Sequence, residues 1–441
     1  MAKTLMPIQV EDAKLMSEGG DLPNYSLAGT GKTLSTLEAF RLSGHRKGIV
    51  LAPAIALDMW KEEIEDYLGA DAQILRKGAD ILSPANDFVI APYDLAAGSQ
   101  RSAIYAAYNE GALILDEADR VRGHTSKRTD AVMGKHCTGK AGFIERADQV
   151  WSLTGNPIYR YHNDLWSQLV GLYPDLFEEY GVLKYADFVQ NFCYSKVKKF
   201  HPRMQPEMTI LSSTNAPIIK HLLHNEIGVI RRKVASDLPP VVEDVLHPKI
   251  AAIPKQYANM INNMNDAQLL RVLMQEESDE DGLAGVWQAV AVAKVKGSVE
   301  YITDLCKATP VLIGHWHSSV GAAYYTELTK VGLKVKRIYG ATPHRERAAV
   351  ELAFNEGSID VIVGQMQAMG VAINLQEASN RVIIAQDHFS PSILEQFIAR
   401  VYRTGQKNTT YVDFLSSNHP LDKAIARIRK ERAKKQADAL D

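Results

Sequence analysis

Two blocks of this sequence alternate short apolar runs with stretches whose apolar residues recur at helical spacing. In the first block, the runs 48–53 and 88–92 end at a proline, and the run 112–115 leads directly into acidic residues. The second block has five such runs, at 311–313, 335–339, 361–363, 382–384 and 411–415. Apolar strands that alternate with helices are typical of a parallel sheet covered by helices on both faces. We therefore expect an α/β fold with two such sheets.

The region between these blocks, from about 166 to 294, has a different character. Its many helix formers and aromatic residues indicate helices, and its acidic run 276–281 indicates an exposed loop. A chain of 441 residues is too long for one ordinary core. We predict a first lobe over 1–165, a helical insertion over 166–245, a helical linker with the acidic loop over 246–295, and a second lobe over 296–441 with a basic C-terminal helix.

The composition narrows the class of protein. Hydrophobic residues make up 46% of the chain and charged residues 23%, as in ordinary globular proteins. The chain contains no apolar run of about 18 residues, which argues against a membrane span, and its first residues lack the apolar stretch of a secretory signal. The three cysteines form no CxxC pair, which argues against a zinc module and suits a reducing compartment. We expect a cytoplasmic protein of a bacterium or phage-infected cell, or a nuclear one if the source is eukaryotic.

The net charge is −2, so a site for a polyanion must be a local patch. Two segments are strongly basic: 196–203, where cations surround Phe200, and 427–435. Either segment could instead be a solvated basic face.

The segment 28–33, Ala-Gly-Thr-Gly-Lys-Thr, directly precedes a stretch of helical spacing. Backbone N–H groups of such a loop can point at phosphate oxygens, and the helix N-terminus adds positive potential. Lys32 would reach the outer phosphates, and the Thr33 hydroxyl would ligate Mg²⁺. Ser26 stands where the full pattern has glycine, and an ordinary helix-capping turn is the alternative interpretation.

The segment Asp116-Glu117-Ala118-Asp119 follows an apolar run. A carboxylate at the C-terminal end of a parallel strand faces the ligand crevice. One carboxylate would hold Mg²⁺, directly or through water, and the next would orient the attacking water. An acidic N-cap cluster is the alternative, but its position after the loop 28–33 favours a nucleotide site.

A third segment, 396–406, lies in the second block. Arg400 and Arg403 are three residues apart, so on a helix they would share a face. Burying two arginines without nearby anions is costly, so a solvated helix face is one explanation. In a protein with a phosphate-binding loop, they would act as arginine fingers on the transferred phosphoryl group.

In this order along the chain, the segments resemble the core of superfamily 2 helicases, and within it the Snf2-like branch. The resemblance covers nearly the whole chain. The matching segments of the first part are 5–9 (glutamine motif), 28–33 (motif I), 52–60 (motif Ia), 91–95 (motif Ib), 116–129 (motif II), 153–166 (motif III), and 230–233 with 238–240 (an Arg-Arg and Leu-Pro-Pro signature). Those of the second part are 311–317 (motif IV), 339–342, 368–375 (motif V) and 396–406 (motif VI). Asn156, Met369 and Ala372 depart from the family's usual threonine and glycines.

The resemblance implies two RecA-like lobes that close on ATP and Mg²⁺, with DNA across both. The nucleotide-binding residues that it implies are Gln9, Gly29, Thr30, Gly31, Lys32, Thr33 and Gly370. The implied Mg²⁺ ligands are Thr33 and Asp116. The implied catalytic residues are Glu117, Gln396, Arg400 and Arg403. The implied DNA contacts are Pro53, Ala54, Tyr93, His315, Thr342 and Asn374.

The compact core resembles annealing helicases and phage branch-migration helicases. This likeness predicts a monomeric ATP-dependent DNA helicase that acts on forked or branched DNA, by branch migration or fork regression, without a membrane partner. Two alternatives stay open. One is a Snf2-type translocase that displaces bound proteins from duplex DNA without unwinding, and the other is an ATP-switched DNA-binding module. The family's tracking along one strand, usually 3′→5′, is also carried over by the resemblance.

Within the insertion, Lys198, Lys199 and Phe200 combine cations with an aromatic ring. Cations can grip phosphates at a fork while an aromatic ring stacks on an unpaired base. We therefore predict that this segment reads DNA junctions as part of a helical wedge. The alternatives are a helical cap whose aromatic residues are core, and a junction-reading role for the tail 427–435 instead.

Overall fold

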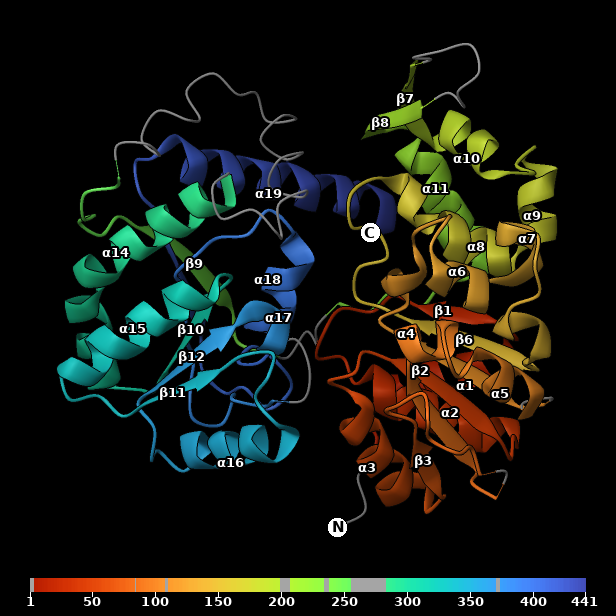
Figure 1. Cartoon of the computed structure of the whole chain (residues 1–441), viewed down its shortest axis with the longest axis horizontal. Helices are drawn as coiled ribbons and strands as arrows, with labels where there is room; N and C mark the ends of the chain where they lie inside the picture. The colour runs from red at the N-terminus through yellow and green to blue at the C-terminus, as the bar shows by residue number, and fades with distance from the viewer. Residues whose placement is uncertain are drawn as a thin grey trace. The chain divides into compact units, whose positions relative to one another are not determined.

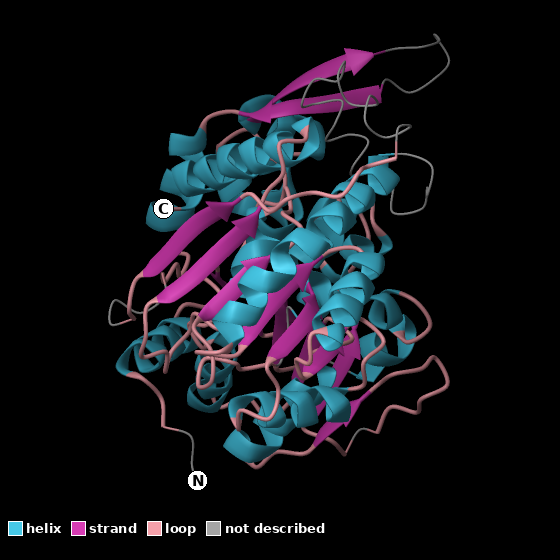
Figure 2. Ribbon diagram, turned by 90° about the vertical axis from the view of Figure 1, so that its left-hand side faces the viewer, coloured by secondary structure: helices cyan, strands magenta, loops and turns pink. Residues whose placement is uncertain are grey.

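The computed structural model describes residues 4–83, 85–107, 110–198, 207–233, 238–254, 283–369 and 373–441. The chain divides into two compact units: unit 1 consists of 1–233 together with 434–441, and unit 2 consists of 234–433. Each unit contains a six-stranded sheet whose strands are all parallel. In each unit the strands lie between helices (Figure 1, Figure 2). The predicted α/β fold with two parallel sheets is therefore confirmed.

The sheet of unit 1 has the strand order β1-β6-β5-β2-β4-β3. Its strands are β1 (Leu22–Asn24), β2 (Gly48–Ala52), β3 (Ala72–Ile74), β4 (Phe88–Pro92), β5 (Ala112–Asp116) and β6 (Gln149–Leu153). All five residues of β2 are buried, as expected of a strand with helices on both faces. The order places β5 and its acidic C-terminal end between β2 and β6, one strand away from β1.

Helices follow most of these strands. They are α1 (Pro7–Glu18), α2 (Lys32–Ser43), α3 (Leu57–Leu68), α4 (Tyr93–Ala97), α5 (Arg101–Ala107), α6 (Lys127–Val132) and α7 (Gly134–Thr138), with the short 3₁₀ turns η1 (Ala118–Val121), η2 (Phe143–Arg146) and η3 (His162–Leu165). The helix α2 ends at Gly44, whose φ of 73° lies in the left-handed region that glycine adopts without a steric penalty. The N-terminal helix α1 packs against α2.

A second cluster of unit 1 follows motif III. It consists of α8 (Trp166–Leu172), α9 (Pro174–Glu179), α10 (Tyr185–Phe192), α11 (Ala216–His221) and the π-helical turn η4 (Leu222–Ile227). Its own core contains Trp166, Phe177 and Phe188, and residues Ala439 and Leu440 from the end of the chain pack into it. Most of the aromatic residues in these helices are therefore core residues.

This region also contains an antiparallel hairpin, β7 (Cys193–Lys198) and β8 (Glu207–Ser213), which was not expected in a purely helical insertion. The hairpin projects from the helices α8–α11 (Figure 1, Figure 2). In β7, Tyr194, Lys196 and Lys198 alternate with Ser195 and Val197, a pattern too polar to stand out as an apolar strand. Lys199 and Phe200 lie outside the described residues, and of Lys198 only the backbone is described, within β7.

The sheet of unit 2 has the order β11-β12-β10-β13-β14-β9. Five of its strands match the predicted runs: β10 (Val311–His315), β11 (Val335–Ile338), β12 (Val361–Gln365), β13 (Arg381–Ile384) and β14 (Thr410–Leu415). The sixth, β9 (Val241–Leu246), lies where helix was predicted and pairs in parallel with β14. Its central residues are exposed, so an edge strand of this kind carries little apolar pattern.

The helices of unit 2 are α14 (Leu283–Cys306), α15 (Ser318–Lys330), α16 (His344–Asn355), α17 (Met366–Met369), α18 (Pro391–Ile398) and the first part of α19 (Pro420–Leu440). The predicted acidic loop 276–281 lies outside the described residues. The basic segment 427–435 is helical, as predicted, and lies within α19. None of the helices in the described ranges is long and apolar enough to cross a membrane.

Candidate nucleotide-binding site

The loop between β1 and α2 has the backbone of a phosphate cradle. Gly29 and Gly31 have φ angles of 83° and 82°, in the left-handed region where a side chain would be strained. Gly31 is the N-cap of α2, which begins at Lys32. The amides at the start of α2 therefore follow directly on the glycine loop, an arrangement that can bind phosphate.

Lys32 lies over this loop. Its Nζ donates to the carbonyl oxygens of Ser26 at 2.6 Å and Leu27 at 3.1 Å. Thr33 is partly exposed in the first turn of α2, whereas the nearly buried Thr30 hydroxyl donates back to the Leu27 carbonyl at 2.9 Å. Lys32 is thus bound to the loop and Thr30 stabilises it, while the roles of Lys32 as a phosphate cation and of Thr33 as a metal ligand stay predictions.

The acidic residues follow β5. Asp116 is the last residue of that strand, and its Oδ2 accepts a hydrogen bond from Trp60 Nε1 at 2.9 Å. Glu117 has a φ of 52°, an unusual backbone conformation for a residue with a side chain and one that is often found at functional sites. The strained turn directs Glu117 differently from the strand before it, so two adjacent carboxylates can take different roles.

The pKa values of this acidic cluster depend on burial, on the repulsion among its carboxyl groups and on the charge of Lys32. Burial, together with repulsion from Asp116 and Asp119, raises the pKa of Glu117 to about 8. Burial also raises the pKa of Asp119 to about 6, and that of Asp116 above its usual value. The charge of Lys32 opposes the shifts of Asp116 and Glu117. Buried carboxylates that repel one another are stabilised by a nearby cation.

This donor set fits a magnesium ion bound together with nucleotide. In the part of the chain that the structure describes, no group of three or more His, Cys, Asp or Glu residues could hold a metal by itself. Mg²⁺ usually keeps several waters and takes only one or two protein oxygens besides the substrate phosphates. Thr33 and Asp116 would supply those oxygens.

Gln9 on α1 contacts the same loop. Its Nε2 donates to the Gly31 carbonyl at 3.3 Å, and its Oε1 accepts from the Met6 amide at 2.8 Å. A Cβ atom at Gly31 would collide with the Gln9 side chain. The glutamine motif is therefore adjacent to the phosphate loop, while its role in adenine recognition stays a prediction.

Motif III follows β6 and packs beneath the phosphate loop. A Cβ atom on Gly155 would lie 3.5 Å from the Ala28 amide nitrogen and 3.6 Å from the Ser26 carbonyl oxygen. The next residue, Asn156, is buried, and its Nδ2 has no hydrogen-bond partner among the described residues. Motif III is therefore in close contact with the phosphate loop.

The predicted DNA contacts of unit 1 differ in exposure. Ala54 is exposed in the loop after β2, beside the buried Pro53. Tyr93, at the start of α4, is only 2% exposed, and its hydroxyl donates to the Asp116 carbonyl at 2.9 Å. This contact makes Tyr93 a support for motif II, and its burial argues against direct contact with DNA.

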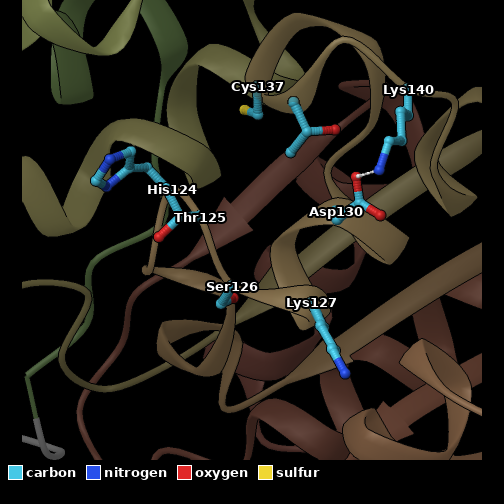
Figure 3. Close-up of a pocket in the computed structure, with 8 residues that line it drawn as sticks. His124, Thr125, Ser126, Lys127, Asp130, Cys137 and Lys140 are labelled. Atoms are coloured by element: carbon cyan, nitrogen blue, oxygen red, sulfur yellow. Dashed lines mark ion pairs between the residues drawn. The ribbon is translucent and has the colours of Figure 1, made fainter. Parts of the chain in front are cut away.

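A hollow of about 460 Å³ lies beside α6 and α7, on the last part of motif II and the residues that follow it (Figure 3). Its lining residues are His124, Thr125, Ser126, Lys127, Asp130, Cys137, Thr138 and Lys140. The ring of His124 stacks on Tyr185, with 3.6 Å between the ring centroids, and Lys140 pairs with Asp130 at 3.6 Å. Hydroxyl and ammonium groups are the usual donors to phosphate oxygens, so this surface offers contacts of the type that a DNA backbone needs.

In unit 2, the helical placement predicted for Arg400 and Arg403 is wrong. The helix α18 ends at Ile398, and both arginines lie in the turns that follow. In these turns the buried Gln406 amide donates to the Val401 carbonyl at 3.2 Å and to the Ser379 carbonyl, in the segment before β13, at 2.9 Å. The spacing of the two arginines therefore does not place them on one helix face.

The two arginines have different surroundings. Arg400 is 9% exposed, and its Nε donates at 3.0 Å to the carbonyl of Gln396, near the end of α18. Arg403 donates to the Asn374 side-chain oxygen, and burial lowers the pKa of Arg403, with partial compensation by Glu351. The charges of both arginines act on Glu351 of α16, and Arg403 is bonded to Asn374 of motif V, whose Gly370 lies outside the described residues.

The remaining predicted DNA contacts of unit 2 are mostly buried. His315 is 1% exposed, and burial lowers its pKa to about 4. Thr342 is 6% exposed and accepts from the Tyr339 amide at 3.1 Å. Asn374, in contrast, is exposed. Contact with DNA is therefore most accessible to Asn374, and all three roles stay predictions.

Sequence reasoning missed Arg347 on α16. Its side chain is 2% exposed and donates to the carbonyl oxygens of Thr342 and Tyr339, each at 2.9 Å, and to that of Ala368. It thereby fastens the 339–342 loop to motif V. Arg347 is one of two arginines in the charged first turn of α16, and nothing in the sequence marks it for such a role.

Comparison with known proteins matches two domain families to the chain. The SNF2-related domain matches residues 26–288, and the helicase conserved C-terminal domain matches residues 299–405. The first match alone covers more than half of the chain.

Curated relatives match along most of this chain. One is the SWI/SNF-related matrix-associated actin-dependent regulator of chromatin subfamily A-like protein 1 of Xenopus laevis, 24% identical over 98% of this chain and 43% of the relative. Another is the probable ATP-dependent DNA helicase CHR12 of Arabidopsis thaliana, 23% identical over 97% of this chain and 42% of the relative. The chain thus spans about two fifths of the length of these relatives.

Among solved structures, the SWI2/SNF2 ATPase core of Sulfolobus solfataricus in complex with dsDNA is similar at 21% identity and a TM-score of 0.44, covering 99% of this chain and 93% of that one. The order of the motifs along the chain and the match of the SNF2-related domain to residues 26–288 both indicate the same family. The chain belongs to the SNF2-related family of superfamily 2 helicases.

Proposed function

We propose that this chain is a DNA-dependent ATPase that moves along DNA and acts on forked or branched substrates. The observation that supports this most strongly is the site in unit 1, where the glycine loop with Lys32 stands beside the carboxylates Asp116 and Glu117. Membership of the SNF2-related family supports DNA as the polymer, as does the name of the Arabidopsis relative, a probable DNA helicase.

In this proposal each residue of the site has a separate task. Lys32 and the first amides of α2 bind the outer phosphates, and Thr33 and Asp116 hold Mg²⁺, which neutralises phosphate charge when bound. Glu117 orients the attacking water and accepts its proton, a task that suits a carboxyl group whose pKa of about 8 is close to the working pH. Hydrolysis then alternates the grip of the two units on one DNA strand.

The first test of this function is stimulation of the ATPase by DNA. We expect duplex DNA to raise kcat, and we expect the stimulation to fall at least about tenfold between roughly 50 and 200 mM salt, because contacts with phosphates release counterions. Steady-state ATPase rates at several salt concentrations, at a fixed DNA concentration, measure this. A basal rate without DNA that equals the stimulated rate would support the ATP-switched binding module instead.

The hairpin β7–β8 supports action at forks. It projects from unit 1 (Figure 1) and carries Tyr194, which is 55% exposed, and the exposed Lys196. An exposed aromatic ring beside a cation can stack on a base freed at a fork while the cation binds the backbone. The hairpin therefore takes the place of the predicted helical wedge.

We expect the double variant Tyr194→Ala, Lys196→Ala to lose strand separation on forked DNA while it keeps most of the ATPase activity stimulated by plain duplex. A strand-displacement assay on forked, four-way-junction and blunt duplexes measures the first property. The matched control is Tyr180→Ala, which removes a ring that is 39% exposed elsewhere in the same helical cluster. If wild type moves along duplex DNA but separates no fork, the chain is a translocase that displaces proteins without unwinding.

A further inference from the structure

The segment 230–232 is far from the phosphate loop in the sequence, but it pairs in parallel with the edge strand β1. The Tyr25 amide donates to the Ile230 carbonyl at 2.8 Å, and the Ile230 amide donates to the Pro23 carbonyl at 3.1 Å. The Leu27 amide, already inside the loop, donates to the Arg232 carbonyl at 2.9 Å. The segment therefore runs parallel to β1 and continues along the entrance of the phosphate loop.

The side chain of Arg231 joins this entrance to motif III. Its Nη1 donates to the carbonyl oxygens of Tyr25 at 2.6 Å and Gly155 at 3.0 Å, and its Nε donates to Asp441 Oδ1 at 3.0 Å. Gly155 is the glycine that packs against Ser26 and Ala28. A planar guanidinium that holds three acceptors fixes the spacing between the loop and motif III.

Arg232 joins the same entrance to α1. Its backbone amide donates to Ser26 Oγ at 3.0 Å, and its Nε donates to Asp12 Oδ1 at 2.9 Å. The buried Asp12 lies on α1, the helix that brings Gln9 to Gly31. Arg232 thus connects Ser26, at the start of the loop, to α1. The same helix contacts Gly31, at the end of the loop, through Gln9.

These contacts also explain Ser26, the residue that departs from the usual glycine. Its hydroxyl accepts from the Arg232 amide, and its carbonyl accepts from Lys32 Nζ. The hydroxyl group of Ser26, which a glycine would not have, therefore binds the 230–232 segment.

The carboxylates Asp12 and Asp441, which pair with Arg232 and Arg231, are partly desolvated, so loss of these ion pairs is unfavourable. Burial raises the pKa of Asp12, and Arg232 opposes that shift. Burial would also raise the pKa of Asp441, but the hydrogen bond and charge of Arg231 bring it below its usual value. Removal of Arg232 would take the hydrogen-bonded cation from the buried Asp12, and removal of Arg231 would leave Asp441 with Lys233 as its cation.

We propose that Arg231 and Arg232 are positioning residues of the nucleotide site, so that ATP binding and turnover depend on two side chains outside the loop and the acidic motif. This inference rests on the proposed ATPase function. Arg231 controls the spacing between the loop and motif III, and therefore turnover. Arg232 controls the fit of α1 and Gln9 to the loop, and therefore nucleotide affinity.

Lysine substitutions test this, because lysine keeps the charge but cannot hold several fixed acceptors. We expect Arg231→Lys to lower kcat about tenfold or more with little change in KM for ATP, since small displacements of reacting groups have large effects on rate. We expect Arg232→Lys to raise KM, and the dissociation constant of a fluorescent ATP analogue, by about tenfold with a smaller change in kcat.

The matched control is Arg101→Lys. Arg101 also donates to a carboxylate and two carbonyls, those of Asp130 at 2.6 and 3.0 Å and Ala141 at 3.2 Å, at a place in unit 1 away from the loop. We expect it to leave basal kcat and KM unchanged. Equal kinetic effects of Arg231→Lys and Arg101→Lys, or a loss of thermal stability alone, would overturn the proposal.

Amide hydrogen exchange separates this inference from the proposed function. We expect faster exchange in the peptide 23–33 for Arg231→Lys and Arg232→Lys, but not for Arg101→Lys. If wild type hydrolyses no ATP, the proposed function fails, while the exchange result still decides the positioning role. If a lysine variant does not fold, Asp441→Asn removes only one partner of Arg231, and we expect it to shift kcat and exchange in the same direction by a smaller factor. Unchanged kcat and exchange in Asp441→Asn would count against the role of Arg231.

Discussion

Replacing Glu117 with glutamine is expected to lower ATP turnover at least about a hundredfold, the usual scale for loss of a general base, while ATP still binds. Glutamine has nearly the shape of glutamate, so the left-handed turn at this residue can persist. It cannot accept a proton from water, however. Steady-state ATPase rates and titration with a fluorescent ATP analogue measure the two properties separately.

The contrast with Lys32→Ala makes this result specific. Lys32 bonds to the carbonyl oxygens of the loop and lies beside both acidic residues, so its loss should weaken nucleotide binding as well as turnover. Glu65→Gln, on the exposed side of α3, is a neutral control. Equal ATPase activity in wild type and Glu117→Gln would remove Glu117 from the mechanism.

Much of the fold followed from local pattern. Strands such as β2 and β10 are buried along their whole length, so they appear in the sequence as uninterrupted apolar runs. The glycine loop and the acidic turn are also local, because each function needs a few adjacent residues at the end of one strand. These features could be predicted because tertiary packing agrees with the local signal.

The features that were missed depend on distant partners. β9 is an edge strand with exposed central residues, so it forms by pairing with β14 and carries no apolar run. Arg231 and Arg347 bind carbonyl groups from segments far away in the sequence. A backbone carbonyl is present at every residue, so the sequence gives no sign of which one an arginine will meet.

The error at motif VI has the same origin. The segment 396–406 reads as a continuous helix, but α18 ends at Ile398, and in the turns that follow the amide of Gln406 donates to the distant carbonyl groups of Gln376 and Ser379. Such contacts are tertiary, and local propensity does not show them.

The largest expected effect belongs to Arg400 and Arg403. If they act as arginine fingers, we expect Arg403→Ala to lower DNA-stimulated kcat by about a thousandfold with little change in nucleotide affinity, because the interaction forms mainly in the transition state. The two arginines do not lie on one helix face. What supports this role is that both charges act on the same residue, Glu351, and that Arg403 is bonded to Asn374 of motif V.

Arg400 needs a gentler variant, because its buried side chain bonds to the end of α18 and alanine there can destabilise unit 2. Arg400→Lys keeps the charge and much of the packing but loses the planar fork, so kcat should still fall. The control is Arg381→Ala, an arginine of unit 2 that stacks on Tyr411 at 3.9 Å. Single-turnover ATPase rates and thermal melting of the three variants decide the question. If all three lose stability to a similar degree and none loses kcat, Arg400 and Arg403 serve the fold of unit 2 rather than the chemistry.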